Sequence, residues 1–397
     1  MKDNHVKRPW SIARLAPIVV VAVATLVYNT LPAITGLLAR QLGFDSETLG
    51  AFGSADLFGM GVGALAAIAV MRNTSPRATA AIGLVVLLVA DLGSAISGSG
   101  AALVSLRALG GVGAGLAVSA GYYMFSLEDQ QRNAAASMLA QIALAVGVIA
   151  GIPRLAHSWG WRAVFVGLGL LLIPCLLLAR HFSAGYKDAN PGDLSGSPAA
   201  TSRILWLGLI SSALFNVAVD GYWTYIESIG AAAGITEDMI SWGLSISTAM
   251  GLLGAVLAIV LGDRVHGSIV VACVIVNIVG IVASSYPNSW VYVTAVSVYY
   301  VTLPIYFSAQ FGTVMRRAAS SRIAAQFTVS IYVGSLGPIL AGLVANHYGV
   351  FAVRWFVVVL TAVSGVLLWF GFFSFYGVHR PSGDGVVSSP KRNSVVL

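Results

Sequence analysis

The chain has 397 residues, of which 57% are hydrophobic and only 9% are charged, with a formal net charge of +7. Soluble domains carry about 25% charged residues, so this composition excludes a soluble globular protein and predicts a membrane protein. The two cysteines, Cys175 and Cys273, lie in apolar runs, which argues against a disulfide framework.

The N-terminal segment MKDNHVKRPWSIARLAP is basic and precedes an apolar run from Leu15 to about Ala39. A signal peptide has a shorter apolar core and a small-residue cleavage site, whereas about 20 apolar residues span a bilayer. We therefore predict a retained first membrane helix. Eleven further apolar runs follow, so the expected spans are 15–39, 49–71, 78–97, 101–127, 133–153, 161–180, 204–229, 239–261, 268–285, 290–315, 323–345 and 351–376.

The longest polar interruption, residues 181–203, separates the sixth span from the seventh. It is rich in Gly, Ser, Pro and Asp, a composition typical of linkers. The predicted fold class is an all-α membrane protein with twelve transmembrane helices in two pseudo-symmetric six-helix bundles. The predicted domains are an N-terminal bundle over 1–180, a cytoplasmic linker over 181–203, a C-terminal bundle over 204–376 and a disordered cytoplasmic tail over 377–397.

Basic residues collect on one side of these spans. If both termini and the loops after even-numbered spans share a side, that side holds all but five of the 22 Lys and Arg residues, the exceptions being Arg40, Arg107, Arg154, Arg162 and Arg354. Loops rich in Lys and Arg face the cytoplasm. Both termini are therefore predicted to be cytoplasmic, in a multi-pass protein of the cytoplasmic (inner) membrane. This distribution also explains the basic charge without a nucleic-acid partner.

The two halves of the chain look like repeats. VMRNTSPR at 70–77 is matched by LGDRVHG at 261–267, and HSWGWRAVF at 157–165 is matched by NHYGVFAVRWF at 346–356, each about 190 residues later. Duplicated six-helix halves are an architecture of secondary transporters, whose substrate site lies near the midplane between the halves.

Three motifs resemble those of the major facilitator superfamily of secondary transporters: GDR at 262–264, RALGGVGAG at 107–115 and GWRAVF at 160–165. The resemblance covers essentially the whole chain. It implies a cavity lined by the first, fourth, seventh and tenth helices and a gating loop that contains Asp263 and Arg264. Two features depart from the family pattern. The first-half loop MRNTSPR lacks an acidic residue, and Arg154 follows Pro153 where antiporter members carry small residues.

The run RALGGVGAG allows two interpretations. A dinucleotide fingerprint needs G-x-G-x-x-G between a strand and a helix, whereas these glycines lie inside an uninterrupted apolar run. Gly111 and Gly115 instead predict a small-residue face for helix packing. Arg107 is then a charge within a membrane helix, which needs a partner. That partner is Asp56 or Asp91, either in a structural ion pair or in a site for proton coupling or for a substrate carboxylate, for which Asp56 is the better functional candidate.

The seventh span, LFNVAVDGYWTYIESIG, carries polar residues along one helix face. Asn216, Asp220, Thr224 and Glu227 follow the spacing i, i+4, i+8 and i+11. An intramembrane carboxylate is a functional hypothesis by default, so Asp220 is predicted to be the proton-coupling residue. A structural hydrogen bond to the first span near Asn29 is the alternative. Glu227, near the outer end, is interpreted as an interfacial residue and is retained as a further proton-coupling candidate.

Other polar and aromatic residues near the middle of the spans are candidate substrate ligands. The tenth span also contains Pro304, which predicts a kink. Its tyrosines lie too deep for an interfacial belt and suit an amphipathic or ring-bearing solute, unless they serve helix packing. The predicted substrate-binding residues are Asn29, Tyr28, Gln141, Asn216, Trp223, Tyr299, Tyr300, Tyr306 and Gln310.

These features predict a secondary active transporter, and not an enzyme, for a small polar or amphipathic organic solute such as an organic anion, driven by protons. A proton-driven exporter of drugs or metabolites is the alternative. A polytopic enzyme fits less well because no acidic or His cluster marks one membrane face, and a channel gives no reason for duplicated halves. Without a Walker loop or a His/Cys cluster, no cofactor or metal is expected. The expected partners are the solute, protons and the lipid bilayer, and the chain is expected to be a monomer.

Overall fold

The computed structural model describes residues 11–127, 130–185, 203–261, 267–317 and 330–373. Within these ranges the regular structure is entirely helical, and each of the twelve predicted spans contains helix. Eight of the described helices are long and apolar enough to cross a membrane. The remaining helices are shorter or more polar, so the count of twelve spans stays a prediction. The cysteines Cys175 and Cys273 are free and buried, as expected.

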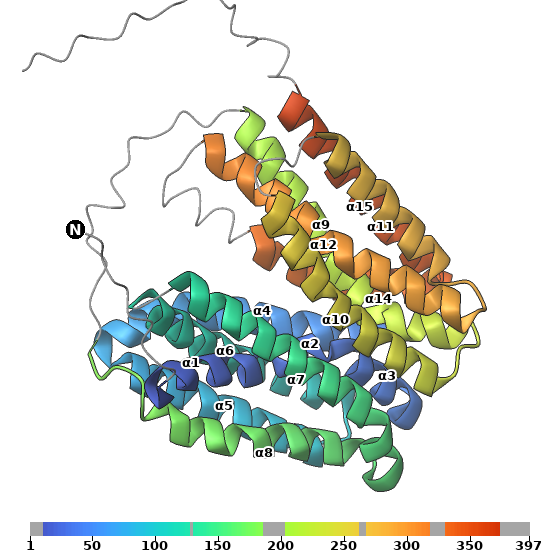
Figure 1. Ribbon diagram of the computed structural model, residues 1–397. Coiled ribbons are helices and arrows are strands. Elements are labelled where there is room, and N and C mark those ends of the chain that lie inside the picture. Colours follow the sequence, from blue (N-terminus) through green and yellow to red (C-terminus); the bar gives the residue numbers. More distant parts are fainter. Residues whose placement is uncertain (1–10, 128–129, 186–202, 262–266, 318–329, 374–397) are drawn as a thin grey trace, which may run out of the picture.

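The first half of the chain forms one bundle (Figure 1). Its helices are α1 (Ile12–Ala24), α2 (Leu26–Asn29), α3 (Leu31–Leu42), α4 (Ser46–Asn73), α5 (Pro76–Ile96), α6 (Gly100–Ser126), α7 (Gln130–Trp159) and α8 (Trp161–Ala179). α4 and α5 both pack on α6, and α1 contacts α6 and α7. In the loop before α4, Asp45 caps the helix by accepting from the backbone N of Thr48 at 3.0 Å, and the hydrogen bonds from Thr48 lower the pKa of this carboxyl.

The second half forms the other bundle. Its elements are α9 (Arg203–Ala232), α10 (Glu237–Leu261), α11 (Gly267–Ala283), α12 (Ser289–Arg317), the 3-10 turn η3 (Val333–Ser335), α14 (Leu336–Tyr348) and α15 (Ala352–Phe373). α10 and α11 pack on α12, while α14 and α15 pack on α9. The bundles touch through α3 with α9, α4 with α14 and α7 with α10. In Figure 1 they meet near α3 and α14 and spread apart toward the start of α1 and the end of α15.

Four glycines with positive φ mark equivalent turns in the two halves. Gly43 (65°) and Gly234 (80°) follow α3 and α9, while Gly160 (75°) and Gly349 (85°) precede α8 and α15. The members of each pair are about 190 residues apart. Glycine adopts this conformation without the clash that a Cβ would make. The internal repeat seen in the motifs therefore extends to the backbone.

The first predicted span is broken into three helices instead of forming one. The breaks fall at Thr25 and Thr30, whose hydroxyls donate to carbonyl oxygens four residues earlier at 3.0 and 2.8 Å. Such bonds compete with the helix ladder and bend helices. Pro32, which has no N–H, weakens the ladder further. The eleventh span is likewise interrupted, by η3.

The glycines of α6 bring its backbone against that of α4. A Cβ added at Gly111 would meet the carbonyl oxygen of Asp56, and one added at Gly115 would meet that of Met60. On the opposing helix, a Cβ at Gly59 would meet the carbonyl oxygen of Ala108. The small-residue packing face predicted from the sequence is confirmed.

We expect Gly111→Val to lower the melting temperature of the detergent-solubilised protein, because the new side chain collides with the α4 backbone. Overpacking of this kind costs about 1–3 kcal/mol or more. Gly151→Val is the matched control, because a Cβ at Gly151 in α7 has no neighbour within 4 Å. Equal melting of the two variants would contradict the close approach of α4 and α6.

Candidate functional site

Asp220 connects the two bundles beside the broken first span. Its carboxylate, on α9, is 6% exposed and accepts a hydrogen bond from the Tyr28 hydroxyl of α2 at 3.1 Å. Trp223, one turn further along α9, donates its indole N–H to the backbone oxygen of Tyr28 at 3.0 Å. Pro32 accounts for this contact, because it lacks the N–H that a regular helix would direct at that oxygen.

The turn η3 packs against Asp220 from within the second bundle. A Cβ at Gly334 would meet Oδ2 of Asp220 and the side chain of Asn216, so only glycine fits there without rearrangement. Asn216, one turn before Asp220, donates through Nδ2 to the carbonyl oxygen of Ser212 at 2.8 Å. Asp220 therefore lies where two interrupted spans approach α9. Interrupted helices of this kind form substrate and ion sites in transporters.

Aromatic side chains of α9 and α12 group around this position. The ring centroids of Trp223 and Tyr300 are 5.2 Å apart, and those of Tyr222 and Tyr299 are 4.9 Å apart. Tyr300 is half-buried, whereas Tyr299 is buried against Tyr222. The structure therefore brings Tyr300 and Trp223 to the predicted site and places Tyr299 behind them.

The polar residues predicted in the first bundle form a connected chain. Asn29 donates to Oγ1 of Thr25 at 3.1 Å, and this oxygen lies 3.0 Å from Oε1 of Gln141. Gln141 donates in turn to the Ser137 hydroxyl at 3.3 Å. Asn29 and Gln141 are both half-buried. This chain fixes the broken part of the first span against α7 and places Asn29 next to Tyr28.

Tyr306 and Gln310 lie apart from this group. Both are completely buried; Gln310 donates to the Ser211 hydroxyl at 3.0 Å, and the Tyr306 hydroxyl is 2.9 Å from that of Ser364. These contacts join α12 to α9 and α15 inside the second bundle. α12 also runs through Pro304 without a break, so the predicted kink does not interrupt the helix. The structure therefore does not bring Tyr306 and Gln310 to the position beside Asp220.

Arg107 is completely buried in the first bundle and contacts both candidate carboxylates. Its Nη2 donates to Oδ1 of Asp91 at 2.8 Å, and its Nη1 is 3.8 Å from Oδ1 of Asp56. The guanidinium also lies over the rings of Phe52 and Phe165. The group is enclosed by α4, α5, α6 and α8 within the first bundle. This position favours the structural ion pair over direct contact with a solute.

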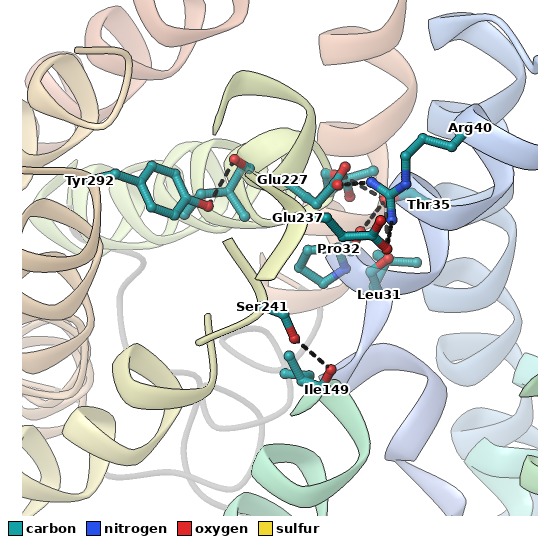
Figure 2. A network of polar contacts seen from close by, with 11 residues as sticks. Leu31, Pro32, Thr35, Arg40, Ile149, Glu227, Glu237, Ser241 and Tyr292 are labelled. Atoms are coloured by element: carbon teal, nitrogen blue, oxygen red, sulfur yellow. Dashed lines mark hydrogen bonds and ion pairs between the residues drawn. The ribbon is translucent and has the colours of Figure 1, made fainter. Parts of the chain in front are cut away.

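The position of Glu227 corrects the interpretation made from the sequence. We expected an interfacial residue, but Glu227 is only 3% exposed, because α3 covers it around Gly36. It forms an ion pair with Arg40 of α3, and Arg40 also binds Glu237 of α10 at 2.9 Å (Figure 2). Sequence reasoning noted Arg40 only as a basic residue outside the main group and missed Glu237. The signal in the sequence that could have indicated this cluster was Arg40 itself, a single cation at the outer end of the first span.

Further bonds join the bundles on the same face as the Arg40 cluster, that is, Arg40, Glu227 and Glu237. The Thr35 hydroxyl donates to the backbone oxygen of Thr224 at 2.9 Å, and the Ser241 hydroxyl donates to that of Ile149 at 2.9 Å (Figure 2). This face of the protein includes the turn at Gly43, and the start of α1 and the end of α15 lie on the opposite face. The bundles are therefore held together on the face opposite these two helix ends.

We expect Arg40→Gln to loosen this face, because Glu227 would remain buried without its cation. A single cysteine at Thr35, which is 1% exposed, should then react several-fold faster with a maleimide. Arg162→Gln is the control, since Arg162 is exposed at the start of α8 and stacks on Trp161. Equal labelling rates in the two backgrounds would show that the Arg40 cluster does not hold the face closed.

The predicted gating-loop residues Asp263 and Arg264 lie outside the described residues.

Several solved structures share this arrangement of helices. The nucleoside transporter NupG has a TM-score of 0.72 at 14% identity, covering 92% of this chain and 99% of that one. A bacterial homolog of the human lysosomal transporter Spinster, inward-facing and unoccupied, has a TM-score of 0.69 at 13% identity, covering 92% of this chain and 97% of that one. A D-xylose–proton symporter has a TM-score of 0.69 at 14% identity, covering 90% of this chain and 96% of that one. No curated protein matches the chain.

The arrangement of helices and these likenesses define the fold of a membrane transporter. The model of the Major Facilitator Superfamily matches residues 18–336. The chain therefore belongs to the Major Facilitator Superfamily, which confirms the resemblance seen in its motifs and the predicted all-α membrane fold of that family.

Proposed function

We propose that the chain is a secondary active transporter that moves a small polar or amphipathic organic solute by alternating access, coupled to protons. Asp220 carries this proposal, because it is a buried carboxylate that is hydrogen-bonded across the bundles to Tyr28. Burial disfavours the charged form of a carboxylate, so opening and closing the site changes its affinity for a proton. Protonation also weakens Asp220 as an acceptor for Tyr28. Proton binding is thereby linked to the contact between the bundles.

The distribution of basic loops supports cytoplasmic termini in the cytoplasmic membrane. The face closed by the Arg40 cluster then lies outside, and the described state opens toward the cytoplasm. Single cysteines at Asp45 and Gly192 are expected to react with an impermeant maleimide from opposite sides. Labelling of both from outside would overturn this orientation.

The residues proposed to contact the solute are Tyr28, Asn29, Trp223, Tyr300 and the more peripheral Gln141 and Asn216. An organic anion has little support, because the buried cation Arg107 and the cation of the outer cluster, Arg40, already pair with carboxylates. Asp56, which Arg107 holds less closely than Asp91, is the second candidate for a proton site. Glu227 is proposed to hold the outer face closed rather than to carry the proton.

Transport into proteoliposomes tests the function. Suitable labelled solutes are uridine and D-xylose, of the classes that two structural neighbours are named for, and the cation N-methylphenylpyridinium. We expect at least one to be accumulated or expelled when a pH difference is imposed, and nigericin, which collapses that difference, to abolish the movement. Flux that is indifferent to the pH difference would contradict proton coupling. Flux no greater than in empty liposomes would contradict transport of these solute classes.

A further inference from the structure

Asp220 differs from the other buried carboxylates in its surroundings. Within the described part of the chain, Asp56, Asp91 and Glu227 each lie within ion-pair distance of an arginine. Asp220 makes no such pair there, and its hydrogen-bond partner is the Tyr28 hydroxyl. An isolated buried carboxylate is costly unless a counter-charge or a proton neutralises it. The described side chains therefore supply no counter-charge for Asp220.

The groups around Asp220 suit a cation. Asn216 uses its N–H to bind Ser212, so its amide oxygen remains as an acceptor on the same helix face. Trp223 and Tyr300 add aromatic rings, whose faces attract cations. The titratable groups that face Asp220 from α2 and α12 are tyrosines, while η3 presents Gly334. Among the described side chains, this combination of one carboxylate, an amide acceptor and aromatic faces includes no fixed positive group that could bind an anion.

We propose that the substrate of this site is an organic cation, a ring-bearing or quaternary ammonium or pyridinium compound, whose charge pairs with Asp220. This inference rests on the proposed function, because it assigns the solute of the same site. The cation and a proton compete for one carboxylate: the protonated acid releases its proton as the carboxylate–cation pair forms. Charge balances in this exchange, and the coupling that follows is proton–cation antiport.

Binding to the purified full-length protein in detergent tests the proposal without requiring transport. The probes are two permanent cations and their uncharged isosteres: N-methylphenylpyridinium with methylbiphenyl, and choline with dimethylbutanol. Calorimetry should show at least one cation binding about tenfold or more tighter than its isostere, which corresponds to about 1.4 kcal/mol. Its affinity should fall as the pH is lowered, and an indicator dye in weak buffer should report proton release on binding.

Two variants separate a charge effect from a folding defect. Asp220→Asn should lose the preference for the cation while binding the isostere as before, whereas Asp220→Glu should keep the preference. If neither cation binds better than its isostere, or if Asp220→Asn keeps the preference, the proposal is wrong.

The binding test and the transport test fail independently. Proton-driven flux of uridine or D-xylose without cation binding would overturn the cation assignment and leave the proposed function standing. Cation binding that depends on Asp220, without any flux driven by a pH difference, would support the cation assignment and overturn the proposed proton-coupled transport.

Discussion

Arg107→Ala should melt well below the native protein and should no longer transport. The guanidinium is completely buried, donates to Asp91 at 2.8 Å and lies 3.8 Å from Asp56. Removing it leaves two buried carboxylates without a counter-charge, and breaking a buried pair costs about 3–5 kcal/mol. The loss also removes the contacts with the rings of Phe52 and Phe165. Thermal unfolding in detergent and proteoliposome flux measure the two effects.

A charge-balanced variant tells whether the penalty is electrostatic. Arg107→Met combined with Asp56→Asn and Asp91→Asn removes the cation and both anions, so it should recover part of the lost stability. Arg154→Ala, at an exposed arginine of α7, controls for losing an arginine as such. Native melting and native transport in Arg107→Ala would show that the ion pairs serve neither structure nor function. Recovery of stability without recovery of flux in the triple variant would assign the triad a role in transport as well.

The sequence predicted the features of this fold that depend on composition along the chain. Apolar runs located the helices, and glycines at 111 and 115 indicated a close helix contact because a residue without a side chain leaves room for a neighbouring backbone. The repeat of Gly160 and Gly349 in matched motifs corresponds to two turns of the same handedness. Each of these signals is local or periodic, which is why it can be read without coordinates.

The partners of the polar residues could not be predicted in the same way. Helical spacing places Asp220 and Glu227 on one face of α9 but does not say which helix that face meets. In the folded chain Asp220 contacts Tyr28 at the break in the first span, and Glu227 contacts Arg40 at the outer end of that span. The break itself is accompanied by hydrogen bonds from threonine hydroxyls to the main chain. Many threonines in membrane helices make such bonds without breaking the helix, so their presence in the sequence does not predict a break.

Tyr299 and Tyr300 illustrate the same limit. Adjacent residues on a helix point in directions about 100° apart, so both could not face one cavity equally. The sequence contained no signal to choose between them. Packing decides: Tyr299 is buried against Tyr222, and Tyr300 is half-buried next to Trp223. Tyr306 and Gln310, about two and three turns further on, point into the second bundle for the same geometric reason.

Asp220→Asn should abolish accumulation driven by a pH difference while leaving exchange of solute at equal pH. The amide keeps the shape of the carboxylate and an oxygen that can accept from Tyr28, whose hydroxyl lies 3.1 Å away, but it cannot titrate. If Asp220 carries the proton, the variant loses the free-energy link between the proton gradient and the solute. Exchange needs only the conformational change, so it persists. If the solute is a cation, exchange requires a higher solute concentration, because the variant lacks the carboxylate that pairs with the cation.

The alternative is that Asp220 holds the first span in place and carries no proton. Tyr28→Phe separates these readings, because it removes the hydrogen bond across the bundles and keeps the carboxylate. A structural role predicts that Tyr28→Phe lowers the melting temperature and impairs exchange, whereas Asp220→Asn, which keeps an oxygen acceptor for Tyr28, changes both less and still accumulates solute. A proton-carrying role predicts that Tyr28→Phe still accumulates solute when a pH difference is imposed and that Asp220→Asn does not. If Asp220→Asn accumulates solute against a gradient, Asp220 is not the coupling residue, and Asp56, the more distant carboxylate partner of Arg107, is the next to test.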